Sequence, residues 1–313
     1  MHETMVLDLK DIDLVFVSYD ELGKDAFYDQ ARKVWPGNVK RVDGVQGIHN
    51  AYRSADELAE TEWFLIVDGD TWIWDNLSFD SFTLPAQSIP CVYSFGSINK
   101  VNELCYGNGG PKLWKKGLIA TRNTHDVVNG TISVDFFTTF RYYQINQTFS
   151  TTVINQCPLQ AARAGYRESV KFMSNNGKIM DDWSLAIRSV ANSNLSRVHI
   201  WCSTGADVEY GLWAVYGSRL GLVDYWTARN LRNSPRYLKM KSSLRYQLLN
   251  DYQTLSAYLE SMIERHADDC EAACRALGDM LVEDVGFWTP LHDANTSKWV
   301  KNIYQNPARS GFI

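Results

Sequence analysis

The sequence predicts an α/β protein with a mostly parallel sheet flanked by helices and a helical C-terminal extension. Three observations lead to this class. Apolar runs of strand length alternate with amphipathic helical patterns between residues 12 and 67. The run Trp63 to Val67 is bounded by charge on both sides, as expected for a strand buried on both faces. From residue 211 onward the pattern is helical.

The N-terminal elements follow the order strand, helix, strand, helix, strand. We expect strands at 12–18, 39–42 and 63–67, and helices at 23–34 and 48–60. Pro36 and Gly37 end the first helix, and the second carries its apolar residues on one stripe at helical spacing. This order is typical of a parallel sheet with right-handed crossovers.

The remainder of the chain is less regular. Its expected elements are a strand at 90–95, a polar glycine-rich loop at 99–114, β-type segments at 132–137 and 149–154, helices at 158–174 and 181–190, a strand at 197–202, and a helical tail from 211 to about 281. We expect a catalytic domain at residues 1–221 and a mainly helical extension at 222–313, packed on the first.

The composition describes an ordered globular protein, with 45% hydrophobic, 13% aromatic and 21% charged residues in a chain of 313. We find no signal-peptide pattern and no stretch of transmembrane length, and therefore expect a soluble, cytoplasmic protein, in the host cytoplasm if it is viral. The six scattered cysteines favour a reduced compartment. His266, Cys270 and Cys274 share one helix face, which is more typical of a buried stripe than of a metal site.

Two carboxylates, Asp68 and Asp70, follow the central apolar run with Gly69 between them. Alternate residues of an extended chain point the same way, so both side chains can face one point. Two adjacent carboxylates repel each other unless a cation lies between them, and oxygen ligands suit Mg2+ or Mn2+. In open α/β sheets ligands bind at the carboxyl ends of strands. Asp-Gly-Asp also occurs in ordinary turns, which is the competing interpretation.

Phosphate-binding glycine motifs are absent from the sequence. The first strand is followed by SYDELGKD, which lacks G-x-G-x-x-G, and no G-x-x-x-x-G-K-S/T occurs anywhere. These absences disfavour a dinucleotide-dependent dehydrogenase and a P-loop NTPase.

The net charge of −5 argues against non-specific coating of nucleic acid. One segment differs from this average, because no acidic residue occurs between Asp224 and Asp251. Six basic residues lie inside it, namely Arg229, Arg232, Arg236, Lys239, Lys241 and Arg245. They form either a solvated helix face or an edge that contacts the phosphates of a polyanionic acceptor.

Several stretches resemble a known family. HNAYRSADELAETEWFLIVDGD, NKVNELCYGNGGPKLW and CPLQAARAGYRESVK resemble nucleotide-sugar glycosyltransferases with the GT-A, Rossmann-like fold. More narrowly, they are similar to bacteriophage glycosyltransferases found beside TET/JBP-type oxygenases. Those glycosyltransferases are thought to glycosylate hydroxymethylated bases in DNA. The resemblance covers about residues 12–221. Pro111 departs from the hydrophobic residue expected in the glycine-rich loop.

The resemblance implies a metal-dependent transfer of a sugar from a nucleotide-diphosphate donor, a UDP-sugar, to 5-hydroxymethylcytosine in double-stranded phage DNA. Asp68 and Asp70 would hold the metal, which neutralises charge on the leaving diphosphate. The residues implied in donor binding are Tyr19, Asp20, Asn50, Arg53, Asp68, Asp70, Asn108, Gly109, Gly110, Lys112, Arg163 and Arg167.

The residues leave three questions open. An inverting enzyme needs a carboxylate base, for which Asp135, Glu168 and Asp207 are candidates, whereas a retaining enzyme needs none. His199 or Asp207 could supply a third metal ligand. The acceptor could instead be a glycan or a protein, and a non-catalytic, metal-stabilised binding protein is a further alternative.

Overall fold

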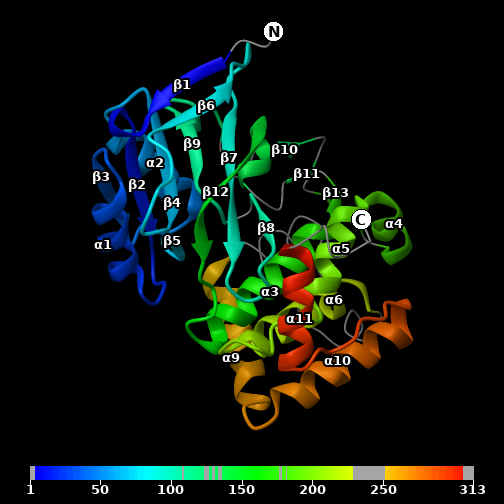
Figure 1. The fold of residues 1–313 in the computed structure, drawn as a ribbon. Coiled ribbons are helices and arrows are strands. Elements are labelled where there is room, and N and C mark those ends of the chain that lie inside the picture. The colour runs from blue at the N-terminus through cyan, green and yellow to red at the C-terminus, as the bar shows by residue number, and fades with distance from the viewer. Residues whose placement is uncertain are drawn as a thin grey trace. The chain divides into compact units, whose positions relative to one another are not determined.

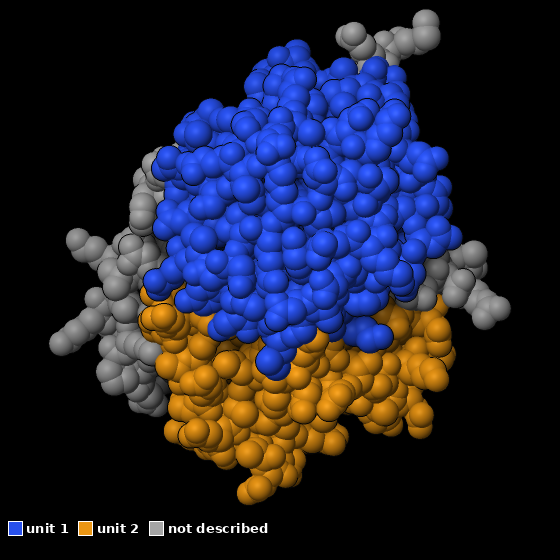
Figure 2. All heavy atoms as spheres, turned by 90° about the vertical axis from the view of Figure 1, so that its left-hand side faces the viewer, with its two compact units in different colours: residues 1–100, 105–126, 136–153 blue, residues 101–104, 127–135, 154–313 orange. Residues whose placement is uncertain are grey.

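A computed structural model of the chain describes residues 4–107, 109–122, 127–128, 131–132, 136–175, 178–180, 182–227 and 251–305 (Figure 1). The chain divides into two compact units, which Figure 2 shows in different colours. The first unit contains residues 1–100, 105–126 and 136–153, and the second contains residues 101–104, 127–135 and 154–313. The domain boundary expected after residue 221 falls inside a helix, Gly211–Trp226, and stays a prediction of where the catalytic region ends.

The first unit is built on a mixed sheet with the strand order β3-β2-β4-β9-β7-β12-β5, and β8 pairs with β7. The strands are β2 (Asp13–Ser18), β3 (Val39–Asp43), β4 (Trp63–Asp68), β5 (Thr71–Ile73), β7 (Val92–Asn99), β8 (Cys105–Tyr106), β9 (Lys112–Lys115) and β12 (Tyr142–Thr152). β2 runs parallel to β3 and β4, and β7 runs parallel to β12. The other pairs are antiparallel. The predicted α/β class is confirmed.

Burial on both faces explains why β2 is a continuous apolar run. Phe16 belongs to one buried cluster and its neighbour Val17 to another, because successive side chains of a strand point to opposite faces. Helix α1 (Lys24–Val34) contributes side chains to the first cluster, and α2 (Ile48–Leu58) contributes side chains to the second. Both helices match the predicted ones to within two residues.

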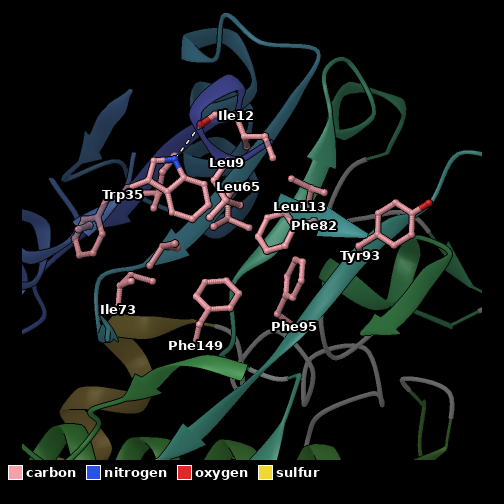
Figure 3. Close-up of a cluster of buried hydrophobic side chains, with 14 of the residues drawn as sticks. Leu9, Ile12, Trp35, Leu65, Ile73, Phe82, Tyr93, Phe95, Leu113 and Phe149 are labelled. Carbon is pink, nitrogen blue, oxygen red and sulfur yellow. Dashed lines mark hydrogen bonds between the residues drawn. The ribbon is translucent and has the colours of Figure 1, made fainter. Parts of the chain in front are cut away.

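An aromatic core fills the face of the sheet on which α1 packs (Figure 3). The ring of Phe82 lies 4.5 Å from that of Phe95, which in turn lies 5.3 Å from that of Phe149. Trp35 follows α1, and its indole nitrogen donates a hydrogen bond of 2.9 Å to the carbonyl oxygen of Ile12 (Figure 3). The chain entering β2 is thereby held against the end of α1.

Smaller elements complete the first unit. A two-stranded antiparallel ribbon pairs β1 (Thr4–Asp8) with β6 (Ser81–Pro85). Short 3-10 helices lie at Leu9–Asp11, Ile119–Thr121 and Phe136–Thr139.

The second unit is mainly helical in the part that the structure describes. Its helices are α3 (Pro158–Phe172), α4 (Trp183–Ser189), α5 (Asn192–Trp201), α6 (Gly211–Trp226), α9 (Tyr252–Arg265), α10 (Cys270–Val285) and α11 (Ala294–Gln305). β10 (Val127–Val128) pairs antiparallel with β11 (Thr131–Ile132), and β13 (Ser174–Asn175) pairs antiparallel with β14 (Lys178–Ile179). Described residues include no helix that is long and apolar enough to cross a membrane.

Small residues let α3 and α6 approach closely. A Cβ atom added at Gly217 of α6 would lie 1.9 Å from the carbonyl oxygen of Ala162, and one at Gly165 of α3 would lie 2.0 Å from that of Ala214. Real Cβ atoms do not approach backbone atoms so closely, so glycine is required at both positions.

The strand predicted at 197–202 is wrong. These residues belong mainly to α5, where Val198 and Trp201 are fully buried three positions apart. Helical spacing of two buried side chains overrides the β-propensity of Val, Ile and Trp. Asp207 therefore follows a helix and does not stand at the end of a strand.

Two other expectations need refinement. The glycine-rich segment 99–114 contains β8 and the start of β9, so it is not a loop throughout. The predicted helical tail is present as α6, α9 and α10, while residues 228–250 lie outside the described residues.

Candidate functional site

Asp68 and Asp70 lie at the carboxyl end of β4, a strand in the interior of the sheet. Asp68 is the last residue of β4 and pairs in register with Val17 of β2. The Tyr52 hydroxyl donates a 3.0 Å hydrogen bond to Oδ1 of Asp68. The carbonyl oxygen of Asp70 accepts a 2.7 Å bond from the backbone nitrogen of Val153. Both carboxylates are partly exposed, so a ligand can reach them.

A third carboxylate, Glu21, packs directly on Gly69. A Cβ atom at Gly69 would lie 2.5 Å from Oε2 of Glu21, so glycine between the two aspartates makes room for it. The same Oε2 accepts a 2.7 Å hydrogen bond from the backbone nitrogen of Tyr19. Burial raises the pKa of Glu21, and the charges of Asp68 and Asp20 raise it further. In the sequence Glu21 follows the first apolar run, and nothing there indicates that it packs on Gly69, 48 residues later.

Tyr19 and Asp20, which are expected to bind the donor, lie in the loop after β2. Lys24 fixes this loop, since its ammonium donates to the carbonyl oxygen of Tyr19 at 2.5 Å and to Oδ1 of Asp43 at 2.7 Å. Ser18 also donates to that oxygen of Asp43, at 2.7 Å. Partial burial opposes ionisation of Asp43, but the bonds from Lys24 and Ser18 outweigh it and lower its pKa. The ends of β2 and β3 are therefore tied by charge.

The glycine loop, residues 107 and 109–112, adjoins the aspartate pair. The carbonyl oxygen of Gly109 accepts hydrogen bonds from the hydroxyls of Thr71, at 3.1 Å, and Thr152, at 3.3 Å. A Cβ atom at Gly110 would lie 2.3 Å from the carbonyl oxygen of Phe95, so this backbone rests on β7. Gly109 has a φ of 76°, which favours glycine. Asn108 lies outside the described residues.

Lys112 does not project freely from this loop. It is buried in β9, and its ammonium donates a 3.0 Å hydrogen bond to the carbonyl oxygen of Gly110 and lies 5.2 Å from the ring centre of Phe137. Asn50 and Arg53 are exposed on α2, and the Asn50 amide bonds to the carbonyl oxygen of Gln46.

In the second unit, α3 carries Arg163, Arg167 and Glu168. The Arg163 guanidinium stacks 3.7 Å above the centre of the Tyr252 ring. Nε of Arg167 and Oε2 of Glu168 are buried and have no hydrogen-bond partner in the part of the chain that is described. Buried polar atoms of this kind are rare in folded proteins and are often satisfied by a ligand or by water.

The remaining candidates are distributed differently. Asp207 accepts hydrogen bonds from the Lys301 ammonium at 2.7 and 2.9 Å, in an ion pair that is largely buried. His199 lies in α5 with its ring 4.5 Å from that of Phe287, and burial lowers its pKa. Asp135 lies outside the described residues, as do the six basic residues between 229 and 245.

No family model and no curated protein matches this chain. Among solved structures, it is similar to a glycosyltransferase involved in glycosylation of the major capsid of PBCV-1, with 11% identity and a TM-score of 0.25, covering 35% of this chain and 63% of that one. It is also similar to the mannosyltransferase PcManGT from Pyrobaculum calidifontis, solved with GDP-Man and Mn2+, with 12% identity and a TM-score of 0.33, covering 82% and 87%. S. aureus TarS 1-349 matches with 9% identity and a TM-score of 0.27, covering 95% and 92%. All three TM-scores lie below 0.5, so we base the functional argument on this chain's own residues.

The aspartate pair fits a divalent cation in its donor chemistry. The described residues contain no group of three or more His, Cys, Asp or Glu side chains that could hold a metal by themselves. Mg2+ in nucleotide-using enzymes is commonly bound by one or two carboxylates together with substrate phosphates and water, and Mn2+ accepts the same oxygen ligands. Two partly exposed carboxylates at a strand end, Asp68 and Asp70, match that requirement.

Proposed function

We propose that this chain is a metal-dependent glycosyltransferase that uses a nucleotide-diphosphate sugar. One observation carries the proposal: Asp68 and Asp70 stand at the carboxyl end of the strand next to β2, and Gly69 between them packs against Glu21. Open α/β sheets bind ligands at this edge. The Thr71 hydroxyl links the glycine loop to Asp70, because it contacts both the Gly109 carbonyl oxygen and Oδ1 of Asp70.

Different residues of the chain have different roles in donor binding. A divalent cation held by Asp68 and Asp70 would neutralise the charge that develops on the leaving diphosphate. Tyr52 donates to Oδ1 of Asp68 and thereby limits the rotation of this carboxylate. We assign Tyr19 and Asp20 to the base and ribose of the donor, as the family resemblance implies. Lys24 holds the Tyr19 backbone, so this loop is ordered before the donor binds.

The chemistry of α3 supports contact with hydroxyl groups. Glu168 offers an oxygen without a described partner, and Arg167 offers an N–H. A sugar or hydroxymethyl group can donate to the first and accept from the second, whereas a phosphate can only accept. For an inverting reaction we favour Glu168 as the base over Asp207, because Lys301 already binds both oxygens of Asp207.

For the donor we propose a UDP-sugar, and for the acceptor 5-hydroxymethylcytosine in phage DNA. The family resemblance and the basic segment 229–245 support this choice. The hydroxymethyl group lies in the major groove of a duplex, or enters the enzyme after base flipping. The net charge of −5 favours the second candidate, a transferase with a glycan or protein acceptor.

Incubation of hydroxymethylcytosine-containing DNA with a panel of UDP-sugars and Mn2+, followed by nucleoside mass spectrometry, tests the proposal. We expect one donor to give a hexose or pentose adduct. Asp70→Asn should reduce turnover by about 100-fold or more, because it weakens the metal site, with little change in melting temperature. The matched control is Asp29→Asn, an exposed aspartate on α1. A large loss of stability in Asp70→Asn without donor turnover in wild type would instead indicate a non-catalytic, metal-stabilised protein.

A further inference from the structure

Thr71 occupies an unusual position between the aspartate pair and the glycine loop. It follows Asp70 directly, opens β5 and is fully buried. Its hydroxyl lies 3.1 Å from the carbonyl oxygen of Gly109 and 3.4 Å from Oδ1 of Asp70. A hydroxyl carries one proton, so it can donate to only one of these two acceptors at a time.

A row of buried hydroxyls, those of Ser97, Ser150 and Thr152, lies next to the Gly109 carbonyl. Thr152 donates to Oγ of Ser97 at 2.8 Å and also lies 3.3 Å from the carbonyl oxygen of Gly109. Ser150 donates to the same Ser97 oxygen at 3.0 Å. Since the shorter contact of Thr152 is to Ser97, Thr71 is the main hydroxyl donor to the Gly109 carbonyl.

The backbone of Asp70 is already fixed from the other side. β5 and β12 pair antiparallel with Thr71 opposite Thr152, and Val153 donates to the carbonyl oxygen of Asp70 at 2.7 Å. The orientation of the Asp70 carboxylate therefore depends on its side-chain torsions. The Thr71 hydroxyl contacts the Asp70 carboxylate and also the glycine loop, through the Gly109 carbonyl.

We propose that Thr71 is a positioning residue that couples the Asp70 carboxylate to the glycine loop. This inference rests on the proposed function, because it assumes that Asp70 binds a cation. The contact of the Thr71 hydroxyl with Oδ1 limits the rotation of the Asp70 carboxylate and so orients it toward the cation. A cation that fixes Asp70 also fixes Thr71, and the Gly109 backbone that Thr71 contacts is then held in place with it.

Two measurements test this coupling without relying on turnover. The first is Mn2+ affinity in the absence of donor, measured from the electron paramagnetic resonance signal of free Mn2+. The second is hydrogen–deuterium exchange of peptides covering residues 105–112, with and without saturating Mn2+. The variants are Thr71→Val, which removes the hydroxyl at nearly constant volume, and Thr71→Ser, which keeps it. Ser150→Ala is the matched control, because its hydroxyl belongs to the same row but touches neither Asp70 nor Gly109.

We expect Thr71→Val to weaken Mn2+ binding by about 10-fold, the usual effect of removing a group that orients a metal ligand. Mn2+ should slow exchange of the loop in wild type, in Thr71→Ser and in Ser150→Ala, but not in Thr71→Val. If Thr71→Val melts far below wild type, Thr71→Ala replaces it, since it removes the same hydroxyl without placing a methyl group against the Gly109 carbonyl.

The outcomes separate this inference from the proposed function. The coupling is overturned if Thr71→Val binds Mn2+ as tightly as wild type and if Mn2+ protects residues 105–112 equally in both. The transferase proposal would still stand. The same is true if Thr71→Ser loses as much affinity as Thr71→Val. Wild type that binds no Mn2+ overturns the metal-dependent function and the coupling together.

Discussion

At the scale of single residues, Glu21 lies in surroundings that disfavour its charge. Its half-buried carboxylate packs against Gly69, and the neighbouring Asp68 and Asp20 carry the same charge. Two backbone N–H groups, those of Tyr19 and of Glu21 itself, partly offset this cost. The balance raises the pKa of Glu21 above its usual value of 4.5.

This shift predicts a pH dependence of stability. The folded state holds the Glu21 proton at pH values where the unfolded state has lost it, so the Glu21 contribution to stability is complete below pH 4.5 and is lost as the pH rises through the raised pKa. Glu21→Gln keeps an oxygen for the Tyr19 N–H and cannot ionise. We therefore expect Glu21→Gln to gain stability relative to wild type as the pH rises above 4.5, in urea unfolding with a chelator present. A constant difference between pH 4 and pH 8 would contradict this prediction.

The residues of the site differed in how visible they were in the sequence. Asp68 and Asp70 were recognisable because they follow a continuous apolar run with alternate spacing. Glu21 and Thr71 were not, because their roles depend on contacts across the fold: Glu21 meets Gly69, and Thr71 meets Gly109, through the register of neighbouring strands. No local pattern encodes such a contact.

At the scale of elements, the parallel strands and their helices could be predicted, and the antiparallel strands only in part. β2, β3 and β4 are local apolar runs separated by amphipathic helices. β9 was missed because its four residues follow a proline-containing loop and adopt the strand conformation by pairing with β4 and β7. α5 was mistaken for a strand because six residues of mixed β-propensity fit either period.

The close contact of α3 with α6 gives a prediction at this scale. Gly217→Ala places a Cβ 1.9 Å from the carbonyl oxygen of Ala162, a backbone atom that cannot yield without moving the helix. In Gly221→Ala the nearest atom, the carbonyl oxygen of Tyr166, lies at 2.8 Å. We expect Gly217→Ala to lower the free energy of unfolding by about 3 kcal/mol and Gly221→Ala by about 1 kcal/mol, measured by urea denaturation. The reverse order would show that the two helices pack differently.

At the scale of the whole molecule, the distribution of charge matters more than its sum. The chain carries a net charge of −5, yet six of its 31 Lys and Arg residues lie between positions 229 and 245, where no acidic residue occurs. An acidic protein can bind DNA if one segment supplies the phosphate contacts, while the remaining surface limits non-specific adhesion.

Neutralising this segment separates DNA from other acceptors. Replacement of the six basic residues by glutamine should weaken binding to duplex DNA and reduce the slope of log affinity against log salt by about 0.9 for every phosphate that the variant no longer neutralises. Hydrolysis of the donor in the absence of acceptor should not change. The matched control replaces six exposed basic residues elsewhere, Lys10, Arg32, Lys33, Arg188, Arg275 and Lys298. Both variants lose the same total charge. If only the variant of segment 229–245 shows a weaker salt dependence of DNA affinity, that segment makes the phosphate contacts. Equal loss of DNA affinity in the two variants would mean that total charge alone governs DNA binding. If the variant of segment 229–245 still transfers sugar to DNA at the wild-type rate, the acceptor is recognised without its phosphates.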